Sequence, residues 1–146
     1  MKIFIFIFIL FATLYTVNTA PHQFYKRTTD FIRCNAAFPG LNVRTIPDPL
    51  VAGQNATFTV VGTQNYPIDQ NKTILEISFH DDVKLATLYD KPFDKSFPPN
   101  TTFWIKASDV PVPSGFNETS LWTIMVTVSE WDPKLIFLAC EISISY

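Results

Sequence analysis

Few residues in this sequence could carry out acid–base, nucleophilic or metal chemistry. The histidines are His22 and His80, and His80-Asp81-Asp82 is the one compact run of titratable side chains. An imidazole beside two carboxylates could transfer protons or hold a metal weakly. The alternative, which we favour, is a solvated turn after a strand, because the spacing places no third ligand or nucleophile nearby.

The sequence also lacks the motifs of well-known catalytic sites. It has no Gly-Xaa-Ser-Xaa-Gly elbow, no phosphate-binding glycine loop and no zinc-spaced set of cysteines or histidines. We therefore predict a protein that is not an enzyme and that needs neither a metal nor a cofactor. A small hydrolase centred on His80 is the alternative, and an unchanged rate after His80→Ala would exclude it.

Two features indicate export from the cell. Residues 1–20 are typical of a signal peptide, with a basic start at Lys2 and an apolar run over residues 3–15 that is too short to span a membrane. We expect cleavage near residues 18–20; an uncleaved anchor is the alternative. Four Asn-Xaa-Ser/Thr sequons for N-glycosylation lie at Asn55, Asn71, Asn100 and Asn117. The alternative is that these sequons are chance matches that carry no glycan. We expect a secreted glycoprotein, with the endosomal or lysosomal lumen as another destination.

Export from the cell would allow the two cysteines to form a disulfide. An exported chain with an even number of cysteines is expected to form disulfides, and Cys34 and Cys140 allow only one pairing. Closing a loop of about 105 residues would contribute on the order of 4 to 5 kcal/mol in the chain-entropy model. The alternative is a pair of buried free thiols.

Composition predicts one globular domain, residues 21–146, after the signal peptide. The 146 residues are 47% hydrophobic and 16% charged, and the formal net charge is −2. Charged residues are fewer than the roughly 25% of an average protein, so the chain should bury a core. A slightly acidic chain lacks the basic footprint of a nucleic-acid-binding protein. We expect a monomer that does not bind nucleic acid.

Alternation of apolar and polar residues predicts β-strands, and no segment after the leader shows helical periodicity. The clearest alternation lies in residues 57–60, 74–79, 103–106, 122–129 and 136–145. Residues 80–96 are less regular, and we expect one short strand near residues 83–88 and then a loop. Pro-rich and Gly-containing breakers separate these segments. About six to eight short strands without helices predict an antiparallel sandwich or barrel.

The chain resembles the ML lipid-recognition family, which includes the Niemann-Pick type C sterol carrier and fungal phosphatidylglycerol/phosphatidylinositol transfer proteins. The resemblance starts with a cysteine soon after the leader and continues through five further segments in order, covering nearly the whole mature chain. These segments are Ile46-Pro47-Asp48-Pro49-Leu50-Val51-Ala52-Gly53-Gln54, residues 101–105, Val110-Pro111-Val112-Pro113, residues 121–128 and Leu138-Ala139-Cys140-Glu141-Ile142. The family's additional cysteines are missing between Ile46 and Ala139, so only the outermost bridge carries over, onto Cys34 and Cys140. The resemblance implies an immunoglobulin-like sandwich that holds a lipid between its two sheets.

The residues themselves are compatible with a lipid carrier. After the leader, about ten Phe and all three Trp remain, which is a large aromatic load for one small sandwich. If the two sheets lie too far apart for their side chains to fill the space between them, an unfilled apolar cavity destabilises the fold. A bound hydrocarbon would offset this loss, because each methylene that it buries contributes about 0.8 kcal/mol. We expect a sterol or phospholipid ligand and transient contact with a membrane. The opening of the lipid-binding cavity is expected near residues 109–116, Tyr66, Pro67 and Tyr89.

The inward-facing apolar positions are the candidate lipid-binding residues: Phe58, Val60, Leu75, Ile77, Phe79, Phe103, Ile105, Trp122, Ile124, Val126, Leu138 and Ile142. For each of them, plain core is the alternative to a pocket wall. The alternative function is an extracellular module that binds a protein or carbohydrate through its surface. A filled core and an exposed aromatic patch around Trp104, Phe116 and Trp131 would favour that module.

Overall fold

The computed structural model describes residues 28–82, 84–116, 121–131 and 135–145. Within these ranges the chain forms eight strands and no helix, arranged as two antiparallel sheets. This confirms the predicted all-β, immunoglobulin-like sandwich. None of the described segments is a helix long and apolar enough to cross a membrane. The predicted signal peptide, residues 1–20, lies outside the described residues.

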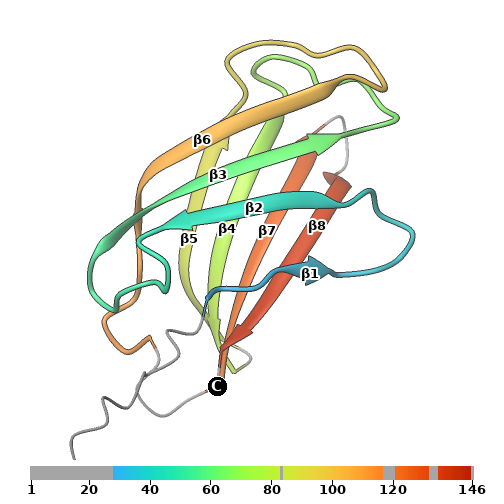
Figure 1. Ribbon diagram of the computed structural model, residues 1–146. Helices are drawn as coiled ribbons and strands as arrows, with labels where there is room; N and C mark the ends of the chain where they lie inside the picture. The colour runs from blue at the N-terminus through green and yellow to red at the C-terminus, as the bar shows by residue number, and fades with distance from the viewer. Residues whose placement is uncertain (1–27, 83, 117–120, 132–134, 146) are drawn as a thin grey trace, which may run out of the picture.

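The larger sheet has five strands in the order β1-β8-β7-β4-β5. Its strands are β1 (Ile32–Arg33), β8 (Leu135–Ser145), β7 (Trp122–Trp131), β4 (Thr73–Asp81) and β5 (Lys84–Pro92). The smaller sheet has three strands in the order β2-β3-β6, namely β2 (Leu41–Ile46), β3 (Asn55–Thr63) and β6 (Thr102–Pro111). In Figure 1 the strands of the smaller sheet run across those of the larger one.

Alternation explains why β3 and the first part of β6 form strands with one buried face and one more exposed face. In β6, Phe103, Ile105 and Ala107 are buried, whereas the residues between them, Trp104 and Lys106, are exposed. Successive strand side chains point to opposite faces, so this pattern turns one face of the strand towards the other sheet. The core therefore lies between the two sheets.

The breaker segments of the sequence hold each other in place at one end of the sandwich. Gly53 donates its N–H to the carbonyl of Val112 at 3.1 Å, and Val112 donates to the carbonyl of Gln54 at 3.0 Å. Gly53 has a φ of 71°, a left-handed conformation that favours glycine. Two segments that carry the family resemblance, residues 46–54 and 110–113, are thus neighbours in space.

The weakly patterned segment after β4 is more regular than the sequence indicated. β5 extends over Lys84–Pro92 and pairs with β4 along its whole length, with an irregularity at Phe79/His80. The expected short strand near residues 83–88, followed by a loop, is therefore corrected to a nine-residue strand. β5 lies at the sheet edge, where both of its faces are largely exposed and the alternation signal is weak.

Candidate functional site

The space between the sheets contains nearly all of the predicted lipid-binding residues. Eleven of the twelve are buried, with exposed fractions of 6% or less. They come from both sheets: Phe58, Val60, Phe103 and Ile105 from the smaller one, and Leu75, Ile77, Phe79, Trp122, Ile124, Val126 and Leu138 from the larger one. The structure therefore gathers them into one apolar interior, and their contact with a lipid stays a prediction.

Aromatic rings join the two sheets in this interior. Phe58 of β3 meets Phe79 of β4 edge to face, with ring centroids 6.4 Å apart. The string of rings continues to Phe116 at 5.8 Å and from there to Trp122 at 5.7 Å. At this position the interior is filled by the protein's own aromatic side chains.

A second group of rings forms a triangle around β6. Phe103 lies 5.4 Å from Phe93 and 6.1 Å from Phe97, and Phe93 and Phe97 are 6.4 Å apart, measured between ring centroids. Edge-to-face pairs at such distances stabilise a core beyond the area that they bury. The predicted residue Phe103 is therefore packed against aromatic neighbours on two sides.

The structure places Ile142 differently from the expectation. Ile142 is half-buried and pairs with Met125 and with Ile32, which is 62% exposed. Its neighbours Glu141 and Ser143 are the buried residues, and they pair with the inward-facing Val126 and Ile124. Directly paired residues of an antiparallel sheet share a face, so Ile142 faces outwards. The apolar alternation of β8 marks its outer face, and that is why the sequence pattern misled.

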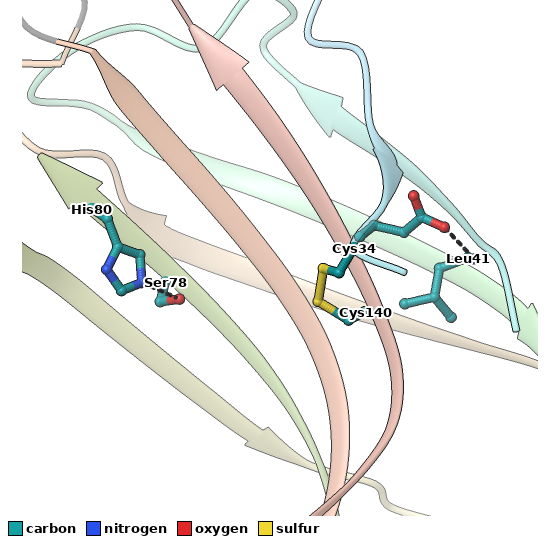
Figure 2. Close-up of a disulfide and its surroundings, with 6 residues drawn as sticks. Cys34, Leu41, Ser78, His80 and Cys140 are labelled. Carbon is teal, nitrogen blue, oxygen red and sulfur yellow. Dashed lines mark hydrogen bonds between the residues drawn. A yellow bond between two sulfur atoms is a disulfide. The ribbon is translucent and has the colours of Figure 1, made fainter. Parts of the chain in front are cut away.

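Glu141 is the polar residue that this register turns inwards. It is 3% exposed, and its Oε1 accepts a hydrogen bond from the Leu41 N–H at 2.9 Å, the bond drawn to Leu41 in Figure 2. Leu41 begins β2, the edge strand of the smaller sheet. A carboxylate of one sheet thus satisfies a free backbone donor of the other, and fastens the two sheets where β8 faces β2.

A groove opens at this junction, with a volume of about 620 Å³. We call it the β1–β2 groove. Its apolar lining includes Phe31, Ile32, Leu41 and Val61, and its polar lining includes Arg33, Asn42 and Glu141. Leu41 and Phe31 also pack against the core, and the Phe31 ring lies 6.5 Å from that of Phe58. The floor of the groove is therefore formed in part by residues that also contact the apolar core.

The disulfide predicted from the cysteine count lies beside the groove. Cys34 and Cys140 form a disulfide (Figure 2). The Cys34 N–H also donates to the Cys140 carbonyl at 3.2 Å. The bridge fixes the short strand β1 to β8, next to Glu141. Sequence reasoning missed the groove because its lining joins segments about 100 residues apart in the chain, as in the Leu41–Glu141 contact.

The interior also contains polar atoms that have no hydrogen-bond partner among the described residues. Gln64 is 1% exposed, and both atoms of its side-chain amide are buried and unpartnered. The indole Nε1 of Trp122 is likewise buried without an acceptor. Leaving such a group unpaired costs about 1 to 3 kcal/mol, so a guest with a polar group could gain a bond here.

His80 does not form the centre of a catalytic arrangement within the described chain. Its Nε2 forms a hydrogen bond with the Ser78 hydroxyl (Figure 2), and the two atoms are 3.0 Å apart. Ser78 is only 2% exposed, so its oxygen is not accessible to a substrate. Among the residues described, no three histidine, cysteine or acidic side chains gather as a metal site.

The remaining predicted sites are distributed over the surface. Asn55, Asn71 and Asn100 are exposed, and Asn117 lies outside the described residues. Their glycosylation stays a prediction. Of the proposed aromatic patch, Trp104 is 59% exposed but Phe116 is 3% exposed, because it packs between Phe79 and Trp122. Phe116 therefore does not belong to an exposed patch with Trp104, and the side chain of Trp131 lies outside the described part of the structure.

Comparisons with solved structures find chains of similar fold. No family model and no curated protein matches the sequence. The crystal structure of chicken MD-1 complexed with lipid IVa matches with a TM-score of 0.46 and 9% sequence identity, over 79% of this chain and 86% of that chain. We class the chain by its own architecture, as an all-β immunoglobulin-like sandwich of two antiparallel sheets.

Proposed function

We propose that this chain is a secreted lipid-binding protein of the ML type, which takes up the apolar part of a sterol or phospholipid between its sheets. The observation that carries the proposal is the β1–β2 groove, whose lining residues Leu41 and Phe31 also pack against the apolar core. The groove has a volume of about 620 Å³ and is broadly open to solvent, so a guest would be covered on one side only.

The lining of the groove suits an amphipathic guest. Leu41, Phe31 and Val61 offer apolar surface, and each methylene that they cover contributes about 0.8 kcal/mol. Arg33 is exposed, and its guanidinium lies against Gly40, where a Cβ would be 2.8 Å from the Arg33 Nε. A guest's head group could therefore meet a cation and the Asn42 amide while its apolar part is hidden.

Lipid uptake tests the proposal directly. Delipidated protein is titrated with a fluorescent sterol and with a fluorescent phospholipid, and we expect saturation at one ligand per chain. Leu41→Lys places a charge in the groove and should weaken uptake at least tenfold. Leu88→Lys is the matched control, because Leu88 is 48% exposed on the outer face of the larger sheet and should leave uptake unchanged.

Absence of uptake for every lipid class would contradict the proposal. Equal weakening by the two lysine variants would contradict the assignment to the groove. Export is tested separately by expression with the native N-terminus, where we expect the secreted protein to start near residue 21 and to shift in mass when N-glycans are removed.

A further inference from the structure

A second concavity lies on the opposite side of the sandwich, where the edge strands β5 and β6 face each other. We call it the β5–β6 pocket. It has a volume of about 280 Å³ and is lined by Lys91, Asp94, Lys95, Trp104, Lys106 and neighbouring residues of β6. Three lysines and one aspartate give this pocket a positive balance in a chain whose formal net charge is −2.

Neutral partners hold two of these lysines in place. The Lys95 Nζ lies 5.1 Å from the ring centroid of Phe97 and 5.5 Å from that of Trp104. The Lys91 Nζ donates a hydrogen bond of 2.6 Å to the backbone carbonyl of Lys106. Aromatic faces and carbonyl oxygens orient an ammonium group without cancelling its charge.

Within the described part of the chain none of the three lysines forms an ion pair, and Asp94 is the one carboxylate that lines the pocket with them. The ammonium groups of Lys91 and Lys95 are therefore ordered before a ligand arrives, which lowers the entropic cost of binding an anion. Trp104, 59% exposed, adds an uncovered aromatic face at the rim. The pocket combines oriented cations with a surface for an organic group.

From this geometry we propose that the β5–β6 pocket binds a phosphate monoester. Lys91, Lys95 and Lys106 donate to the phosphate oxygens, and the Trp104 indole covers the organic part of the ligand. A compact dianion suits three ammonium groups, because charge-assisted hydrogen bonds are about twice as strong as neutral ones. The small volume accommodates a head group and not a whole lipid. This site lies apart from the β1–β2 groove and does not depend on lipid uptake there.

The phosphate can be free or can belong to a lipid head group, and two probes separate these sources. In the first, the full chain is titrated with inorganic phosphate at constant ionic strength and tryptophan fluorescence is recorded. In the second, it is sedimented with phosphatidylcholine vesicles with or without phosphatidic acid. Binding of both probes, with mutual competition, assigns the site to a head group. Binding of inorganic phosphate alone assigns it to a soluble phosphate ester.

Charge variants locate the binding. Lys95→Gln should weaken phosphate binding about tenfold, the loss expected for a hydrogen bond to a charged group. Lys84→Gln removes the same charge from the other end of β5 and should leave binding unchanged. Two results would overturn the proposal: no saturable binding of inorganic phosphate together with no preference for phosphatidic acid, or an equal loss in the two variants. The second result would show attraction to overall charge.

Discussion

Removing the Phe103 ring tests whether the interior at β6 is packed core or ligand wall. Phe103 is fully buried, and its ring meets Phe93 at 5.4 Å and Phe97 at 6.1 Å. A buried Phe→Ala change typically costs about 3 to 5 kcal/mol. Two edge-to-face pairs are lost at the same time, each worth about 0.5 to 1.5 kcal/mol. We therefore expect Phe103→Ala to fall in the upper half of that range.

This loss should be plain in a thermal melt. For a domain of this size, about 4 °C is lost per kcal/mol, so Tm should fall by roughly 15 to 20 °C. The adjacent residue supplies the control, because Trp104 is 59% exposed on the other face of the same strand. Trp104→Ala removes one exposed cation–π contact with Lys95 and should cost about 1 kcal/mol or less.

Delipidated protein is the sample for both variants, and urea unfolding gives the free energies alongside the melts. A loss below about 1.5 kcal/mol for Phe103→Ala, together with lost lipid uptake, would refute the packing argument. It would show that the ring borders a space which the ligand fills. A large loss with lipid uptake retained at low temperature would assign Phe103 to the core and leave the β1–β2 groove as the binding site.

Three further changes probe the fold. Replacing Cys34 and Cys140 together by serine should cost about 2 to 5 kcal/mol in urea unfolding, and non-reducing mass spectrometry should show the bridge in the native protein; two alkylatable thiols in secreted material would contradict it. Burial, with the nearby Asp90 carboxylate, raises the pKa of Glu76, so its ionisation opposes folding as the pH rises above the ordinary value of 4.5. Glu76→Gln should therefore stabilise the protein at pH 7 and leave it unchanged near pH 3, where both side chains are neutral; equal gains at both pH values would contradict this. Gly62→Ala should cost about 1 to 3 kcal/mol, because a Cβ there would lie 2.7 Å from Leu41 and 2.9 Å from Phe103; an unchanged melt would show that both neighbours yield freely.

Alternation in the sequence predicted the strands that have one wet face and one buried face. β6 is the clearest case, since Phe103, Ile105 and Ala107 are buried and the residues between them are exposed. The same rule predicted the wrong face for Ile142, because β8 carries apolar residues on its outer face and Glu141 on its inner face. Register depends on the neighbouring strand β7, which local periodicity cannot reveal.

The candidate sites were harder to predict than the fold. The β1–β2 groove needs Leu41 beside Glu141, and the β5–β6 pocket needs Lys91 beside the backbone of Lys106. Each pairing joins strands of different sheets, so it follows from how the sheets stack and not from spacing along the chain. The disulfide could be predicted because only two cysteines exist.

The side-chain bonds at the edges of the smaller sheet also bear on self-association. A free strand edge offers unpaired backbone groups to which a neighbouring molecule can add a strand. Here Glu141 occupies the Leu41 N–H on β2, while Tyr89 and Lys91 donate to the Ser108 and Lys106 carbonyls on β6. An incoming strand would have to displace these side chains before it could pair, so the molecule carries its own protection against growth into sheet-like aggregates.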